Sequence, residues 1–489
     1  MLVRQSKNSF IRLKGEHGYI TNQMTRWDRA YNETGTDFLS TISRQPQDVD
    51  RIVKEKLLPQ YDGVSYEELH GDYVSFLKDL EKNLFVVTGE TPEELDARDP
   101  EFSYALGNMK TQTDDYTQHT EAFVSENTQD LNLESHQRKP HLMTLQFELT
   151  SRCNERCIHC YIPNGKKNAG KDMPIEKVKS LIDEFAEMGG LHVTLSGGEA
   201  FLHPKLIEAM QYCREKDMQI SILSNLIALT DSQVEAIRKA NVSNVQVSLY
   251  SMIPEHHDFI TTVKGSFERT KRAVEKLVAA DVPVQISCPV MKANKDDYKD
   301  VLLYAQSLNI KAQTDYVMMA RSDLDTENLA NRISLEETEK LLRELIEYDM
   351  DYRETTLQQR PVSEEIKFDL ERYKKQPLCG AGINDCCVTE NGDVYPCAGW
   401  QAMVLGNVYE KSLKEIWETS EKAAEIRKVT QADFPKCIDC EARDYCARCL
   451  VRNFNECNGD MFALPQHFCD VAFLNKRLVE EYRSKGLIG

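Results

Sequence analysis

Three cysteines stand within eight residues of one short stretch, SRCNERCIHCY, at positions 151–161. Cys153, Cys157 and Cys160 are three and four residues apart in one tight loop, and cysteines so placed do not easily form disulfides with each other. Clustered thiolates can instead bind metal. A 4Fe–4S cluster held by three protein thiolates keeps one iron free for a substrate or cofactor. The alternatives are a zinc site or a four-ligand electron-transfer cluster, completed by a distant cysteine or by His159.

Composition limits the classes of function. The chain has 489 residues, enough for two to four domains, and 79 acidic against 60 basic residues give a formal charge of −19. This balance argues against nucleic-acid and anionic-membrane partners. The first residues hold no apolar signal segment, and no run is long enough to span a membrane. We therefore expect a cytoplasmic protein, in which thiols stay reduced and clustered cysteines bind metal.

The elements that position the first cysteines form a regular pattern. Strand-like stretches alternate with helix-period stretches, which predicts a parallel α/β sheet that curves into a partial (β/α)6 barrel over 141–330. The cysteine loop follows the first strand, at the carboxyl end of the sheet, where such folds place their sites. The six expected strands are 142–149, 191–196, 219–224, 244–250, 283–290 and 313–319.

Other segments flank the predicted barrel. Residues 1–88 combine short strands with three amphipathic helices. Residues 89–140 form a predicted acidic linker, because positions 90–134 hold twelve acidic and only two basic residues. A helical connector is expected over 331–375. Residues 376–489 form a cysteine-rich domain with a final helix, and ten of the fifteen cysteines lie between Cys379 and Cys469.

The stretch CNERCIHCY resembles the CxxxCxxC signature of radical S-adenosylmethionine (SAM) enzymes, and TLSGGEAFLHP resembles their Gly-Gly-Glu-Pro motif. ILSNLIAL and VQVSLYS stand at the ends of the third and fourth strands, as in that family. The resemblance covers about 143–320. It implies that a reduced cluster cleaves SAM to a 5′-deoxyadenosyl radical, which abstracts hydrogen from an unactivated carbon.

The resemblance also assigns cofactor-binding residues. Gly197 and Gly198 let the backbone approach SAM without a Cβ clash. The remaining roles are Glu199 at the methionine amino group, Ser248 at its carboxylate, Ser224 or Asn225 at the ribose, and His159 packed near the adenine. Two departures are Ala200, where the family usually has proline, and Thr261, where relatives often carry arginine.

The second cysteine group resembles the SPASM extension of radical SAM enzymes, which binds two auxiliary clusters. Cys379, Gly392 and Cys397 match its opening spacing, whereas Cys449 follows Cys446 one residue earlier than usual. The pattern implies three 4Fe–4S clusters in all. One auxiliary cluster would take Cys379, Cys397, Cys449 and a fourth cysteine; the other would take Cys437, Cys440, Cys446 and a late cysteine, Cys469 in preference to Cys457. A zinc ribbon is the alternative.

The fourth ligand of the first auxiliary cluster follows from a hairpin prediction. TENGDV is a signal for a two-residue turn at Asn391-Gly392. Counting outward from that turn places Cys386 opposite Cys397, on the same face of the hairpin. Cys386 is therefore the expected ligand, and Cys387 would point the other way and pack as a small apolar residue.

The front segment resembles the winged-helix module that captures leader peptides on enzymes that modify ribosomal peptides. The alternative role is stabilisation or dimerisation. These resemblances predict a peptide maturase that forms a thioether or carbon–carbon cross-link in a precursor peptide, with an external reductant such as flavodoxin or ferredoxin. The linker would let the tethered leader present its core peptide to the radical site at high effective concentration.

Two other functions stay open. An iron–sulfur scaffold or electron-transfer protein would not cleave SAM. A sulfatase-maturing enzyme needs a base near its substrate, and such relatives carry an aspartate directly after the cysteine that closes the hairpin. This chain has Ala398 at that place, which argues against sulfatase maturation.

Overall fold

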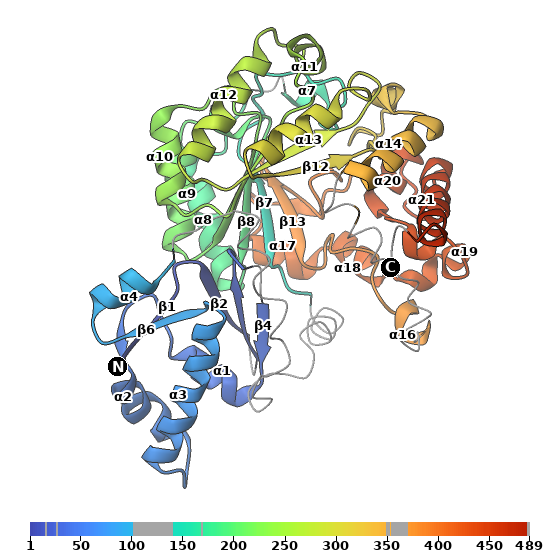
Figure 1. Cartoon of the computed structure of the whole chain (residues 1–489). Helices are drawn as coiled ribbons and strands as arrows, with labels where there is room; N and C mark the ends of the chain where they lie inside the picture. Colours follow the sequence, from blue (N-terminus) through green and yellow to red (C-terminus); the bar gives the residue numbers. More distant parts are fainter. Residues whose placement is uncertain are drawn as a thin grey trace.

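The computed structural model describes residues 1–14, 17–25, 28–100, 140–167, 170–348, 353 and 370–486. These residues form a front unit, a curved central sheet with outer helices, and a C-terminal region (Figure 1). Most of the predicted acidic linker, and residues 349–352 and 354–369 of the predicted connector, lie outside the described residues. Among the described residues, no helix is both long and apolar enough to cross a membrane.

The front unit contains two small antiparallel sheets, ordered β5-β1-β6 and β2-β3-β4, with helices packed against them. Its own core is rich in aromatic rings, and Phe38 meets Tyr73 and Phe76 edge to face at 5.3 and 5.5 Å. Its elements are β1 (Leu2–Gln5), β2 (Ser9–Lys14), β3 (His17–Asn22), β4 (Asp28–Tyr31), α1 (Glu33–Ser40), β5 (Gln47–Asp48), α2 (Val49–Ile52), η1 (Val53–Leu57), η2 (Leu58–Gln60), α3 (Tyr66–Lys82), β6 (Val86–Gly89) and α4 (Pro92–Arg98).

Helix α4 falls inside the range predicted as linker. Thr91 caps it by accepting a hydrogen bond from the Glu94 amide, and proline occupies its first turn. Beyond the helix, Asp99 is buried and pairs with Arg4 at 3.0 Å. The front unit therefore continues through Asp99, about one helix beyond the predicted boundary at residue 88.

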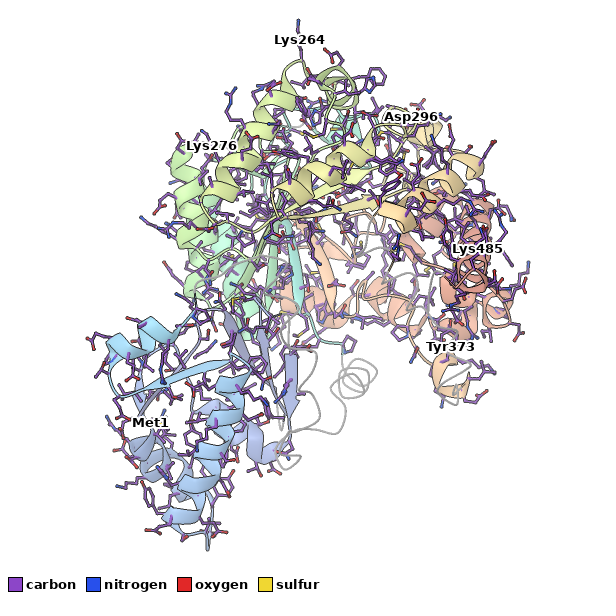
Figure 2. The ribbon with its side chains drawn as sticks, in the orientation of Figure 1. Met1, Lys264, Lys276, Asp296, Tyr373 and Lys485 are labelled. Carbon is purple, nitrogen blue, oxygen red and sulfur yellow. The ribbon has the colours of Figure 1, made fainter. Side chains whose placement is uncertain are left out.

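Six parallel strands form the barrel sheet in the order β12-β11-β10-β9-β8-β7. Alternate strand residues such as Leu145 and Phe147 pack under the outer helices, so the predicted α/β fold is confirmed. The elements are β7 (Thr144–Glu148), α7 (Asn164–Lys167), α8 (Ile175–Glu187), β8 (His192–Ser196), η3 (Ala200–Leu202), α9 (Leu206–Glu215), β9 (Gln219–Ser224), α10 (Asp231–Lys239), β10 (Asn244–Ser248), α11 (Pro254–Thr261), α12 (Ser266–Ala279), β11 (Val284–Pro289), α13 (Tyr298–Ser307) and β12 (Lys311–Asp315). Figure 2 shows Lys264, Lys276 and Asp296 on the outside of this helical layer.

The C-terminal region extends the same sheet. Strand β13 pairs in parallel with β7, with Cys386 beside Leu145, and β14 and β15 continue antiparallel. Barrel and C-terminal residues share one hydrophobic core that includes the buried Trp400. The elements after the barrel are η4 (Glu327–Asn331), α14 (Leu335–Tyr348), α16 (Leu370–Lys374), β13 (Asp385–Thr389), β14 (Asp393–Tyr395), β15 (Gly406–Asn407), α17 (Leu413–Thr419), α18 (Glu421–Lys428), η5 (Gln431–Asp433), α19 (Pro435–Ile438), η6 (Arg443–Tyr445), α20 (Leu450–Glu456) and α21 (Gln466–Ser484).

The front unit docks directly on the amino edge of the barrel sheet. Asp217, in the turn before β9, accepts hydrogen bonds from Arg44 at 2.9 Å, and its carbonyl accepts one from Arg12 at 2.6 Å. Arg12 also donates to the carbonyl of Gly190, before β8, at 2.7 Å. These contacts attach the front unit to the barrel at the edge opposite the predicted cluster loop.

Candidate iron–sulfur and cofactor sites

The predicted cluster loop follows β7 at the carboxyl end of the sheet. Its backbone is fastened to α11, because the Arg156 and Ile158 amides donate to the carbonyls of Thr261 and Ile260 at 3.1 and 3.0 Å. Thr261 thus holds the loop through its backbone carbonyl. The Cys153, Cys157 and Cys160 thiols are partly exposed. They stand on one anchored loop, as a three-thiolate cluster requires.

Two glycines let the next strand end pack against this loop. A Cβ on Gly197, which has φ +150°, would lie 2.6 Å from the Thr150 carbonyl oxygen. A Cβ on Gly198 would lie 2.4 Å from the Arg152 carbonyl oxygen. The Gly198 amide donates to Thr150 at 2.7 Å. Glycine is therefore required here by the close approach of two backbones.

Glu199 ties the ends of β8 and β9 together. Its buried carboxylate accepts hydrogen bonds from the Phe201 amide at 2.9 Å, the Ser224 hydroxyl at 2.7 Å and the Asn225 amide at 2.8 Å. Burial raises the pKa of Glu199. The Asn225 side chain also donates to Asn154 of the cluster loop at 2.7 Å. The structure thus brings these predicted residues together, and they bond to one another.

Ser248 and His159 both lie beside Tyr250, a residue to which the sequence analysis gave no role. The rings of His159 and Tyr250 meet nearly at right angles, with centroids 4.9 Å apart. Tyr250 is buried, and its hydroxyl lies 4.0 Å from the Cys157 sulfur. Its position two residues after β10 could have indicated a role in the sequence, because β10 ends at the predicted cofactor-binding residue Ser248.

Three cysteines of the first auxiliary group gather at one place. Cys449 and Cys379 lie near enough to Cys397 to raise the pKa of its thiol further, after burial, and the Leu450 amide is hydrogen bonded to Cys379. Burial raises the pKa of the Cys379 thiol to about 11 and that of Cys397 to about 12. A cluster bound by these cysteines would stabilise their thiolate forms, because a metal deprotonates its thiol ligands.

The hairpin register differs from the prediction by one residue. Cys387 lies opposite Tyr395, and Val388 lies opposite Val394. The turn has three residues, because Thr389 accepts a hydrogen bond from the Gly392 amide at 2.8 Å and Gly392 has φ +87°. This is a type I turn followed by a left-handed glycine, a common three-residue hairpin loop. The two-residue turn predicted from Asn391-Gly392 is therefore wrong.

In the corrected register, Cys386 and Cys387 each lie on the opposite face of the hairpin from the predicted one. Cys386 shares a face with Leu145 and packs in the core under the outer helices. Cys387 points to the opposite, inner face, and Cys397 is among the groups close enough to affect its thiol. In the corrected register Cys387, and not Cys386, shares a face with Cys397, because one register step moves every side chain to the other face.

The second auxiliary group also gathers in space. Burial raises the pKa of the Cys446 thiol, and the nearby Cys469, Cys437 and Cys440 raise it further. The charged neighbours of Cys457 are instead Glu456 and Asp460. This geometry supports the preference for Cys469.

The donor chemistry can be tested against the expected metal. All fifteen cysteines are free thiols. Among the described residues, no three His, Cys, Asp or Glu side chains lie close enough together to hold a single metal ion, as a zinc site would require. Thiolates are the donors that iron–sulfur clusters use, so the donor types of the cluster loop and of the two auxiliary groups fit such clusters.

A buried carboxylate lies beside the cluster loop, and sequence reasoning missed it. Glu148 ends β7 and accepts hydrogen bonds from the Gln401 amide at 2.9 Å on both carboxylate oxygens. Burial raises the pKa of Glu148 to about 7. With Gly198, Lys166 and Glu390 it lines a cavity of about 160 Å³ between the cluster loop and the hairpin turn. Its position just before the cysteine motif was the only feature of the sequence that could have indicated a role for Glu148.

Tyr161 lies between the cluster loop and the first auxiliary group. Burial raises the pKa of Tyr161 well above its usual range, and the nearby Glu148, Cys387, Cys160 and Cys397 raise it further. Tyr161 therefore has neighbours in both the cluster loop and the first auxiliary group.

Comparisons with known proteins agree with this geometry. Residues 147–305 match the radical SAM superfamily, and residues 379–441 match the SPASM iron–sulfur cluster-binding domain. The chain is 27% identical over 324 residues to the AdoMet-dependent heme synthase of Methanosarcina barkeri (strain Fusaro / DSM 804), covering 63% of this chain and 91% of that protein. It is 27% identical over 322 residues to the antilisterial bacteriocin subtilosin biosynthesis protein AlbA of Bacillus subtilis (strain 168), covering 63% and 67%.

A solved structure resembles nearly the whole chain. Streptococcus suis SuiB bound to the precursor peptide SuiA superposes with a TM-score of 0.61 at 17% identity, over 93% of this chain and 97% of that one. At this identity the likeness concerns the fold. Because it covers 93% of this chain, it includes most of the front unit.

Proposed function

The chain is a radical SAM enzyme with a SPASM domain, and from this premise we propose that it cross-links a ribosomally made precursor peptide. The link, a thioether or a carbon–carbon bond, forms at an unactivated carbon. The observation that carries the proposal is the front unit, which is fixed to a radical SAM barrel and a cysteine-rich region in one chain. A small-molecule reaction gives no reason for this additional unit.

We propose that three clusters are bound. The SAM cluster takes Cys153, Cys157 and Cys160, and the network of Gly197, Gly198, Glu199, Ser224, Asn225, Ser248 and His159 surrounds SAM. When bound, this cluster and SAM supply a radical that removes a hydrogen atom from the substrate. The auxiliary clusters take Cys379, Cys387, Cys397 and Cys449, and Cys437, Cys440, Cys446 and Cys469. Flavodoxin or ferredoxin supplies electrons in the reducing cytoplasm.

The front unit is proposed to bind the leader of the precursor as an added strand. In the sheet β2-β3-β4, β2 faces the barrel, because Arg12 donates to Asp217 and Gly190. Within the described residues β4 forms the other edge of that sheet. An extended leader that pairs with β4 would start near the amino edge of the barrel, and its core peptide would continue to the carboxyl edge.

Glu148 is proposed to accept the proton that the peptide loses when the link forms, and an auxiliary cluster would take the remaining electron. The Glu148 carboxylate is held by Gln401, and the adjoining cavity includes Lys166 and Glu390, whose side chains can hydrogen bond to peptide groups. Glu148 also revises the argument from Ala398, since a carboxylate is present although position 398 has none. Sulfatase maturation must therefore be judged by experiment.

Similarity to heme synthases favours a tetrapyrrole as the second candidate substrate. That similarity spans 63% of the chain, and the cavity beside Gly198 measures about 160 Å³. Ligand pockets for drug-sized molecules usually measure about 300–1,000 Å³. The cavity therefore favours a peptide side chain over a tetrapyrrole.

A substrate panel tests the proposal. The anaerobically reconstituted enzyme receives SAM and dithionite with one of three substrates: the peptide encoded by a short open reading frame beside its gene, iron-coproporphyrin III, or a Cys-x-Pro-x-Arg peptide. We expect a modified product from the first peptide alone. A changed tetrapyrrole, or an aldehyde that a hydrazine probe captures, would contradict the proposal.

A further inference from the structure

Tyr250 reaches the cluster loop from the far side of the barrel mouth. It follows β10, whereas Cys157 follows β7, and the Tyr250 hydroxyl lies 4.0 Å from the Cys157 sulfur. The side chain is only 3% exposed. A buried hydroxyl needs a hydrogen-bond partner, and an unperturbed tyrosine is protonated and able to donate at neutral pH.

The ring of Tyr250 is held in place by its surroundings. It packs between His159 and His257, with ring centroids 4.9 and 5.4 Å away. His257 is buried and its Nδ1 lies 3.0 Å from the Ser266 hydroxyl. The side chain of Ser248 lies near the Tyr250 hydroxyl. The hydroxyl proton can therefore point towards the Cys157 sulfur.

We propose that Tyr250 donates a hydrogen bond to the Cys157 thiolate of the SAM cluster and thereby raises the cluster's reduction potential. The inference rests on the proposed cluster site. A donor withdraws charge from the sulfur and favours the reduced cluster, which carries one more electron. The cluster must be reduced before its electron can pass to SAM, so a hydrogen-bond donor at this sulfur makes that reduction easier. Tyr250 is therefore a positioning residue that acts through Cys157.

Tyr250→Phe tests the proposal because it keeps the ring and deletes only the donor. The reconstituted holoenzyme is titrated without SAM, and the midpoint is followed by electron paramagnetic resonance on the signal that SAM later perturbs. We expect a more negative midpoint, with about tenfold less favourable reduction, which equals about 59 mV for one electron. Tyr212→Phe is the matched control, because its hydroxyl bonds Asp183 on the outer helices and not a cysteine. It should leave the midpoint unchanged.

A second variant covers the case in which Tyr250→Phe loses iron. Incorporation of 3,5-difluorotyrosine at position 250 keeps the donor and makes it more acidic, so the midpoint should shift in the positive direction. An unchanged midpoint in every iron-replete variant would overturn the proposal. If the unmodified protein shows no SAM-responsive signal, the proposed function itself has failed, which is a different result.

Discussion

Two neighbouring cysteines show how strongly chemistry at the residue scale depends on register. The sequence alone predicted Cys379, Cys397 and Cys449 as ligands of an auxiliary cluster, because residue type and spacing are sufficient to suggest one. The choice between Cys386 and Cys387 required the turn, and glycine in the left-handed region made it a three-residue turn. Residue types could be predicted, whereas the face that a side chain occupies could not.

The cysteine exchange gives the first prediction. Cys387→Ala should lose most of one auxiliary cluster, about four of about twelve irons, because the inner-facing thiolate is removed. Cys386→Ala is the matched control and should keep its iron, with a modest loss of stability from the buried side chain. Iron analysis and electron paramagnetic resonance distinguish the two. Greater iron loss from Cys386→Ala would show that the hairpin register is wrong.

Glu148 gives the second prediction. A proton acceptor works in its ionised form, and burial raises the pKa of Glu148 to about 7, so cross-linking should rise with pH through that value. Glu148→Gln should slow cross-linking by about 10²-fold or more and remove this rise, while uncoupled SAM cleavage persists. The pH–rate profile of peptide product against 5′-deoxyadenosine measures both. A Glu148→Gln profile that keeps the rise near pH 7 would exclude this role.

At the scale of elements, hydrophobic alternation was sufficient to predict the six barrel strands, although β12 begins and ends earlier than the pattern indicated. The pairing of β13 with β7 was not predicted, because residues 385–389 and 144–148 are distant in the chain and no local pattern joins them. Helix α4 could have been found, since TPEELDAR carries a threonine cap and a proline in the first turn.

The close packing of Gly198 against the cluster loop gives the third prediction. Gly198→Ala should disrupt the packing of the strand end on the cluster loop, because its Cβ would lie 2.4 Å from the Arg152 carbonyl oxygen. We expect weaker SAM binding and less iron in the SAM cluster, measured by equilibrium dialysis and iron analysis. Gly71→Ala is a control, because its Cβ would meet nothing within 4 Å. Unchanged SAM affinity in Gly198→Ala would contradict the close packing.

At the scale of the whole molecule, the front unit is docked rather than merely tethered. The sequence predicted a separate unit joined by an acidic segment, and the pattern contained no information on where that unit would sit. Its place was decided by scattered residues, among them Arg12, Arg44 and Asp217, whose meeting no motif encodes. If the front unit binds the leader as proposed, its docking would fix the distance between that leader and the proposed radical site.

The docking contact gives the fourth prediction. Asp217→Asn removes the charge that Arg44 contacts, while asparagine tolerates the left-handed backbone, φ +54°, at this position. The front unit should loosen, with faster hydrogen exchange in β2 and at the Asp217 turn. Asp231→Asn is the control, since its pair with Lys276 is exposed and such pairs contribute little. Equal exchange in both variants would mean that this contact does not hold the unit.

The central claim is that this radical SAM enzyme closes a link within a peptide. The most direct measurement is high-resolution mass spectrometry of the precursor peptide after incubation with SAM and reductant, beside a count of 5′-deoxyadenosine. We expect a peptide lighter by two hydrogen atoms, with an internal link that blocks fragmentation between the joined residues. Replacement of Cys153, Cys157 and Cys160 by alanine should abolish both products. Formation of 5′-deoxyadenosine with every candidate precursor left at its original mass would show that the enzyme does not cross-link these peptides.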